Sequence, residues 1–186
     1  MDHICTILTL GLILFLSAPN VGAKPKPKIS EDLNDVDYYL FAKGNKRFSF
    51  KIDVTAQELL NHGFNPAFPT KIVVHGWVKS GLSYATEFAE AYEKAGDFNV
   101  IGIDWDKLAT IDSYLGAAIN SNRVGEHVGI NLVDKIFMKQ LNQDPLQIHA
   151  IGHSLGAHLV GHIGRAVHQS SGRKIARVTG NAYLRY

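Results

Sequence analysis

The stretch Gly152-His153-Ser154-Leu155-Gly156 constrains this chain more than any other part of it. It follows LQIHAIG (146–152), whose β-branched and apolar residues predict a strand, and precedes AHLVGHIGRAV (157–167), which predicts a helix. A G-x-S-x-G sequence between a strand and a helix is typical of the sharp turn that presents a nucleophilic serine at the edge of an α/β sheet. The turn excludes a Cβ on either flanking glycine, which explains Gly152 and Gly156.

Further strands and helices alternate along the chain. Strands are predicted at VDYYLFA (36–42), RFSFKIDV (47–54), KIVVHGW (71–77), FNVIGIDW (98–105) and KIARVTG (174–180), and helices at 84–96 and 113–141. The first two strands form a hairpin around residues 43–46, and the later ones are separated by connections long enough for right-handed crossovers. The sequence therefore predicts an α/β fold with a mostly parallel central sheet and an antiparallel N-terminal hairpin.

The N-terminus has the features of a secretory signal. ILTLGLILFLSA (7–18) is apolar but too short for a membrane span of ~20 residues, and Val21-Gly22-Ala23 offers small residues for cleavage before Lys24. We predict a signal peptide over 1–23, a basic, proline-containing tail over 24–36, a secreted protein, and no transmembrane span after cleavage.

Composition excludes several kinds of partner. Without Asp2, the mature chain has 19 basic and 16 acidic residues, and a net charge of +3 is too small to predict binding to nucleic acid. The single cysteine, Cys5, leaves with the signal, so no disulfide is expected. His158 and His162 are spaced like zinc ligands, but no Asp, Glu or Cys follows them to complete a site. We expect no metal and no cofactor.

Two backbone amides are candidates for an oxyanion hole beside Ser154. The Leu155 N–H lies in the first turn of the predicted helix, where free N–H groups and the helix dipole favour a negative charge. The second donor is expected from the loop after an earlier strand, where HGW (75–77) fits. Gly76 would allow close approach to the substrate carbonyl group, and the Trp77 N–H would donate to it.

Three segments together resemble the pancreatic-lipase family: PTKIVVHGWVKSG (69–81), VIGIDW (100–105) and HAIGHSLGAHLVGHIGR (149–165). The resemblance extends from about Asp37 to Gly180. It implies an α/β-hydrolase fold, secretion, and hydrolysis of carboxylic esters in triacylglycerol or phospholipid (A1-type) at a lipid–water interface. By this match Ser154 is the nucleophile, and the Trp77 and Leu155 amides are the oxyanion donors.

The rest of a catalytic triad is missing from these residues. In α/β hydrolases the acid and then the histidine follow the serine, but residues 155–186 contain no Asp or Glu. Their three histidines, His158, His162 and His168, belong to the helix that leads away from the serine. Members of the resembling family continue as T-G-L-D-P-A, with the Asp as triad acid, whereas Asn181-Ala182 follows Thr179-Gly180 here.

We interpret 37–186 as a partial lipase domain, truncated at its C-terminal side, as in a truncated isoform. Loss of the histidine costs roughly 10⁶ in turnover, so the chain as written is expected to be nearly inactive. The alternatives are a non-catalytic lipid-binding or carrier protein on a lipase scaffold, and a misfolded product without a function of its own.

Other residues are given structural roles. Asp104 is expected to accept hydrogen bonds from nearby backbone amides, beside a packed Trp105. Ala157, Gly161 and Gly164 form a stripe that would let their helix approach the sheet closely. Core packing is expected for the aromatic side chains Phe88, Tyr92, Phe98, Tyr114 and Phe137, whereas Tyr84 and Phe88 could instead line an acyl cleft, with core packing favoured.

Overall fold

The computed structural model describes residues 30–44, 46–77, 80–110 and 113–181. The predicted signal peptide, 1–23, and the KPKPK segment, 24–28, lie outside the described residues. Residues 30–36 contact the domain: the Ser30 amide donates to the Lys107 carbonyl oxygen, 3.1 Å away, and Val36 is buried.

A six-stranded sheet forms the centre of the fold, in the order β2-β1-β4-β3-β5-β6. Its strands are β1 (Asp37–Ala42), β2 (Lys46–Phe50), β3 (Thr70–Val74), β4 (Asn99–Asp104), β5 (Ile148–His153) and β6 (Arg177–Asn181). The strand β1 is antiparallel to β2 and β4, while β4, β3, β5 and β6 run parallel. The predicted fold class, an α/β-hydrolase sheet with an antiparallel N-terminal hairpin, is confirmed.

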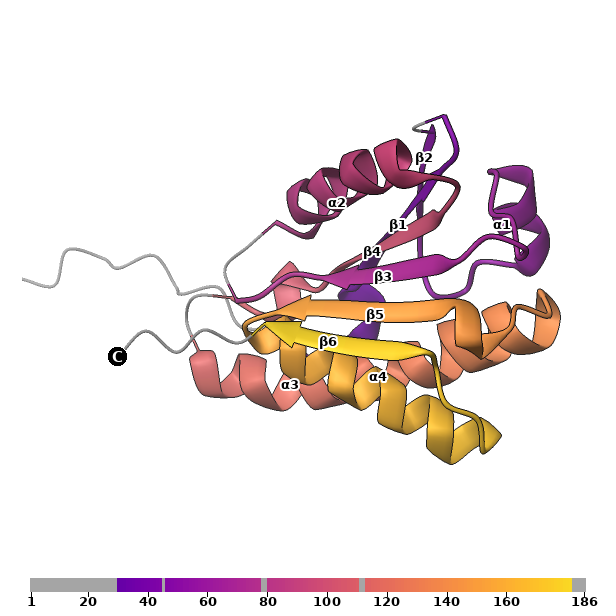
Figure 1. Cartoon of the computed structure of the whole chain (residues 1–186). Helices are drawn as coiled ribbons and strands as arrows, with labels where there is room; N and C mark the ends of the chain where they lie inside the picture. The colour runs from indigo at the N-terminus through magenta and orange to yellow at the C-terminus, as the bar shows by residue number, and fades with distance from the viewer. Residues whose placement is uncertain (1–29, 45, 78–79, 111–112, 182–186) are drawn as a thin grey trace, which may run out of the picture.

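Helices cover the sheet from both faces (Figure 1). The helices are α1 (Ala56–Asn61), α2 (Gly81–Ala95), α3 (Tyr114–Val128), a π-helical segment (Gly129–Gln140) and α4 (Leu155–Ser171), with short 3₁₀ turns at Leu33–Asp35, Asp106–Leu108 and Pro145–Gln147. On one face α2 packs against β4, β3 and β1, and on the other α3 and α4 pack side by side. Within the described residues no helix is long and apolar enough to cross a membrane.

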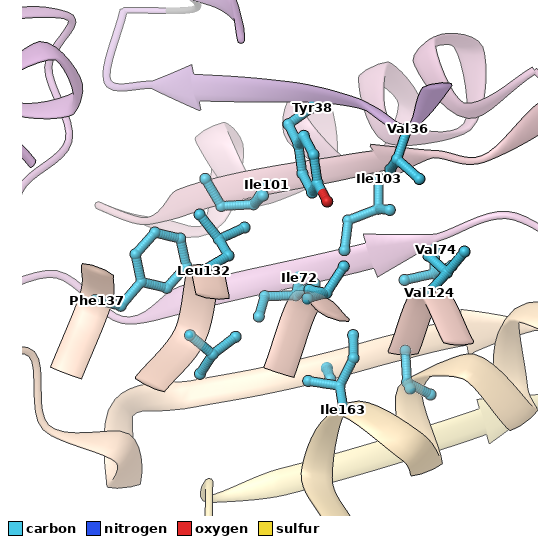
Figure 2. Packing of buried hydrophobic residues seen from close by; sticks show 14 of the residues in the cluster. Val36, Tyr38, Ile72, Val74, Ile101, Ile103, Val124, Leu132, Phe137 and Ile163 are labelled. Carbon is cyan, nitrogen blue, oxygen red and sulfur yellow. The ribbon is translucent and has the colours of Figure 1, made fainter. Parts of the chain in front are cut away.

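The main core fills the space between the sheet and the α3–α4 layer. Figure 2 shows Tyr38, Ile72 and Ile101 from the strands directed toward helical side chains that include Leu132 and Phe137 of the π-helical segment, which continues α3. All five of these side chains have no exposed surface, and burying a Leu, Ile or Phe side chain stabilises a fold by about 1.5–3 kcal/mol. A second, smaller cluster lies under α2 on the opposite face.

Two of the expected elements differ from the structure. The strand predicted to Val54 ends at Phe50, and α1 follows, begun by a capping box in which Thr55 and Glu58 bond each other's backbone amides. The long helix predicted at 113–141 is present, but its second half is π-helical; the Leu141 amide bonds the Ile136 carbonyl oxygen five residues back.

The small-residue stripe on α4 is partly wrong. A Cβ built on Gly180 of β6 would lie 2.9 Å from the Ala157 Cβ, and one built on Gly164 would lie 3.1 Å from a Val178 methyl group. Ala157 and Gly164 of α4 therefore do lie close against the sheet. A Cβ on Gly161 would meet nothing within 4 Å, because this position faces away from the sheet.

Candidate active site

Ser154 lies at the sharp turn between β5 and α4. Its backbone has φ 53° and ψ −122°, a conformation that non-glycine residues rarely adopt and that concentrates at functional sites. Its amide donates to the Asn181 carbonyl oxygen at the end of β6, 2.8 Å away, which anchors the turn to the neighbouring strand. Although Ser154 is the residue that caps α4, its hydroxyl makes no capping hydrogen bond.

The glycines on either side of Ser154 are required by close packing. A Cβ built on Gly152 would collide with the backbone of Gly156 and come within 2.7 Å of the Ala157 nitrogen. One built on Gly156 would lie 2.5 Å from the His75 carbonyl oxygen and 2.6 Å from that of Val74. The turn therefore packs directly against the end of β3.

The loop that follows β3 lies against the serine. A Cβ on Gly76 would come within 2.8 Å of the Ser154 Cβ and 2.9 Å of the His153 carbonyl oxygen, so only glycine permits this approach. The next residue, Trp77, donates its indole N–H to the Thr110 carbonyl oxygen, 2.8 Å away, and packs edge-on against Tyr114, with ring centroids 5.4 Å apart. These two contacts fix the position of the Trp77 side chain.

Leu155 is the first residue of α4 and is buried. Its N–H belongs to the first turn, whose amides have no partner within the helix. The structure thus brings the three site residues predicted from the sequence to one place: Ser154 at the turn, Leu155 beside it, and Trp77 on the loop packed against it.

His75 is a residue of this site whose contribution the sequence did not predict. Its side chain has no exposed surface. The Nδ1 atom lies 2.7 Å from the Gly76 carbonyl oxygen, to which it can donate, and Nε2 lies 3.0 Å from the Trp105 amide nitrogen and 3.2 Å from Asp104 Oδ1. In return, the Trp105 indole N–H donates to the His75 carbonyl oxygen, 3.0 Å away. These contacts tie the loop after β3 to the end of β4.

The prediction for Asp104 and Trp105 is confirmed. Asp104 accepts a hydrogen bond from the Asp106 amide, 3.2 Å away, and Trp105 is completely buried. Burial raises the pKa of Asp104, but the contacts with His75 and with the amides of Asp106 and Leu82 lower it more, so the carboxyl group titrates below its ordinary range. Asp104 is therefore a carboxylate at neutral pH.

Comparison with known proteins shows which family the chain belongs to. The model of the family described as Lipase matches residues 18–182. The chain belongs to the Lipase family. The resemblance to pancreatic lipases that the sequence segments indicated is thus confirmed.

Individual relatives are similar over most of this lipase-family chain. Human phospholipase A1 member A is 30% identical over 185 residues, which cover 91% of this chain and 38% of the relative. Human hepatic triacylglycerol lipase is 29% identical over 195 residues, covering 95% and 38%. Human inactive pancreatic lipase-related protein 1 is 32% identical over 112 residues, covering 60% and 22%. The chain thus spans well under half the length of these relatives.

Among solved structures, Bacterial Heroin Esterase matches with a TM-score of 0.39 and 15% identity, over 77% of this chain and 43% of that one. A likeness of this size carries no functional information.

Tyr84 lines a cavity on the α2 side of the turn. The cavity has a volume of about 340 Å³, and its other lining residues are Ser80, Ser83, Glu87 and His153. The rings of Tyr84 and His153 lie 6.2 Å apart, and burial, followed by the charge of Glu87, raises the pKa of the Tyr84 hydroxyl. Tyr84 and Phe88 of this lipase-family chain both pack against the small core under α2, as favoured from the sequence, and Tyr84 in addition lines the cavity next to His153.

Of the other aromatic side chains predicted to pack the core, three do so and one does not. Phe137 is completely buried, as predicted, and Tyr92 and Phe98 pack against the small core. Tyr114 is 52% exposed and contacts Trp77, so the prediction that it packs the core is wrong. As the first residue of α3, it lies at the end of the helix and outside the packed layer.

Among the described residues, the histidines of α4 make no hydrogen bond to the Ser154 hydroxyl. His158 and His168 are exposed, and the Cβ of His162 faces Gly125 of α3, where a built Cβ would lie 2.6 Å from it. Burial, with a smaller effect of the charges on Arg165 and His158, lowers the pKa of His162. Across the described ranges, no three His, Cys, Asp or Glu side chains gather as metal ligands would.

Proposed function

We propose that this lipase-family chain is secreted and carries the nucleophilic half of a serine esterase site that cleaves carboxylic esters of lipids. One observation carries the proposal: Ser154 occupies a strained turn with its hydroxyl free of any capping bond, directly against the glycine of the loop that follows β3.

The chemistry assigned to these residues is acyl transfer. The Ser154 Oγ attacks the ester carbonyl carbon, and the carbonyl oxygen, which gains a negative charge, accepts hydrogen bonds from the Trp77 and Leu155 amides. Preorganised donors of this kind are each worth about 10²–10³ in turnover. The names of the relatives, phospholipase A1 and triacylglycerol lipase, support a lipid ester as the substrate.

The proton of Ser154 needs a base, and these residues do not provide one. No Asp or Glu follows Ser154 in the sequence, and the described histidines make no hydrogen bond to it. We therefore expect the 186 residues alone to hydrolyse esters slowly, at about 10³–10⁴ over water, the residual that an oxyanion hole and substrate binding supply without a triad.

A fluorophosphonate probe tests the assignment. The expected result is slow labelling that peptide mapping assigns to Ser154 and that the Ser154→Ala variant abolishes, with hydrolysis of a nitrophenyl ester barely above the Ser154→Ala background. Labelling at another serine would refute Ser154 as the nucleophile. Labelling as rapid as in a complete serine hydrolase would refute the expectation of low turnover and leave the nucleophile assignment intact.

A second candidate function is non-catalytic lipid binding on the same scaffold. The observation that favours it is the relative whose name describes it as inactive. A folded protein that binds lipid vesicles but is not labelled at Ser154 would support this candidate over the esterase.

A further inference from the structure

Among the described residues, the main helix contacts of β5 and β6 are with α4, on the face opposite α2. The helix α2 packs against β4, β3 and β1, while α4 packs against β5 and β6 from the opposite face (Figure 1). Parallel strands are usually covered on both faces. The described residues therefore leave side chains of β5 and β6 accessible on the α2 side of the sheet.

Three basic side chains form a row across this part of the sheet. Lys71 of β3 is aligned with His149 of β5, and His149 is aligned with Arg177 of β6. Aligned residues of neighbouring parallel strands share a face and lie about 4.8 Å apart between strands. We refer to Lys71, His149 and Arg177 as the basic row.

The position of the lysine is held by two aromatic rings. Its Nζ lies 5.3 Å from the centre of the Tyr92 ring and 5.1 Å from that of Phe98. Cation–π contacts of this length restrain an ammonium group without neutralising it. The positive charge of Lys71 is therefore retained within the basic row.

The row has no acidic partner among the described residues. None of the ion pairs found there includes Lys71, His149 or Arg177. Burial and then the charge of Arg177 lower the pKa of Lys71, and burial followed by the charges of Lys71 and Arg177 lowers the pKa of His149. The charges of Lys71 and Arg177 thus repel each other and disfavour the imidazolium form of His149, and an anion between the three side chains would relieve both effects.

A cavity gives an anion access to the row. It has a volume of about 290 Å³, and Lys71, His149 and Arg177 all line it, together with Pro69, Leu146, Gln147, Ile148 and Ala176. A water molecule occupies about 30 Å³, so a hydrated polyatomic anion fits. The ring of His149 is oriented by a 2.9 Å hydrogen bond between its Nε2 and the Thr179 hydroxyl.

We propose that the basic row binds a phosphate group. Arg177 offers a planar fork that can hold two phosphate oxygens, Lys71 adds a point charge, and His149 adds a third polar contact. The dianion balances the two permanent charges of Lys71 and Arg177, which a single carboxylate would not. The phosphate belongs either to a free ion or to the head group of a phospholipid.

The proposed site is separate from the nucleophile. His149 is near the beginning of β5, whereas Ser154 follows its end, five residues later. At about 3.3 Å per residue, the two lie roughly 16 Å apart along the strand. Phosphate binding can therefore be measured without reference to ester hydrolysis, and its failure would leave the esterase proposal untouched.

The direct measurement is the titration of His149 by NMR, with its signal assigned by comparison with a His149→Gln variant. Inorganic phosphate, compared with chloride at equal ionic strength, is expected to raise the pKa of His149, because a nearby anion favours the imidazolium form. The melting temperature is expected to rise over the same range of phosphate concentration.

Two variants separate a specific site from general attraction to a basic protein. Arg177→Gln is expected to weaken phosphate binding about tenfold, since it removes charge-assisted hydrogen bonds. Lys174→Gln removes one positive charge at a position three residues before Arg177. The Lys174 side chain does not line the cavity, so this variant is expected to leave phosphate binding unchanged. Equal losses in the two variants would overturn the proposal, as would an unchanged His149 titration in phosphate.

Vesicles identify the source of the phosphate. Binding to vesicles containing phosphatidic acid but not to pure phosphatidylcholine, together with only weak binding of inorganic phosphate, would assign the site to a lipid head group. Equal affinity for inorganic phosphate would assign it to a free ion. If Arg177→Gln bound both the vesicles and inorganic phosphate as well as the parent chain does, the proposed site would be refuted for both sources.

Discussion

Substituting alanine for two glycines of the same helix tests how closely α4 approaches the end of β3. Gly156 lies in the first turn of α4, and its built Cβ would be 2.5 Å from the His75 carbonyl oxygen and 2.6 Å from that of Val74. Gly161 lies one and a half turns further along, and its built Cβ would meet nothing within 4 Å. The chemical change is identical at the two positions, whereas their surroundings differ.

The expected free energies follow from these distances. An ordinary contact begins at 3.4 Å, so Gly156→Ala requires backbone atoms to separate by almost 1 Å. Overpacking of this kind costs about 1–3 kcal/mol, and because the contacted atoms belong to backbone rather than to flexible side chains we expect about 2–3 kcal/mol. The gain in helix propensity, at most about 1 kcal/mol, offsets only part of this. Gly161→Ala has the gain without the clash.

Urea unfolding followed by circular dichroism measures both effects, with the slope of the transition checked for constancy. Gly156→Ala is expected to lower the free energy of unfolding by about 1–2 kcal/mol, and Gly161→Ala to raise it by up to about 1 kcal/mol. At about 2–4 °C per kcal/mol, the melting temperatures should change in opposite directions. Labelling of Ser154 by a fluorophosphonate should fall further in Gly156→Ala, since its clash is with the loop beside the serine.

The reasoning would be refuted if the two variants had the same stability, or if Gly156→Ala were as stable as the parent chain. Either result would mean that α4 does not approach the backbone of Val74 and His75 as closely as the structure has it.

Two further predictions concern Asn99 at the beginning of β4 and Glu58 in the first turn of α1. Asn99→Ala is expected to lower the free energy of unfolding by about 3 kcal/mol, because the buried side chain bonds the Asn65 amide, the Asn65 carbonyl oxygen and the Thr70 hydroxyl. All three bonds would be lost, and the Asn65 amide would keep no partner among the described residues. A change in the urea midpoint as small as that of an exposed Asn→Ala variant would contradict it. Hydrogen bonds from the backbone and the side chain of Thr55 lower the pKa of Glu58. The Glu58 carboxylate therefore stabilises the fold at pH values above 4.5, its ordinary pKa, and this stabilisation is lost as the pH falls through the lower pKa of the folded state. The stability difference between the parent chain and Glu58→Gln should therefore disappear in acid, and an equal difference at pH 3 and pH 7 would exclude this cause.

The sequence predicted the elements around the serine because their patterns are local. A β-branched run before Gly152 and a long apolar periodicity after Gly156 each suffice to specify a strand or a helix without knowledge of the rest of the chain. The helix α1 was missed although Thr55 and Glu58 form the T-x-x-E spacing of a capping box, which was a readable signal. The π-helical half of the long helix had no such signal, since its apolar spacing does not differ visibly from that of an α-helix.

The errors in packing arise from contacts between segments distant in sequence. Gly161 was assigned to the sheet side of α4 by its spacing from Ala157, but the helix is rotated so that Gly164 and Ala157 face β6 and Gly161 does not. Tyr114 was assigned to the core because it is aromatic, yet it lies at the exposed beginning of α3 against Trp77. Neither outcome can be deduced from the residue type alone.

By itself, the sequence determined the class of fold and the strand–turn–helix arrangement around Ser154, because hydrophobic periodicity and glycine placement depend only on neighbours along the chain. Only the tertiary structure decided that His75, Asp104 and Trp105 connect the loop beside Ser154 to β4, since they come from strands 30 residues apart that become neighbours in the sheet. The alignment of Lys71 with His149 and Arg177 was likewise decided by strand order and register, which arise from pairing between distant segments and not from any local pattern.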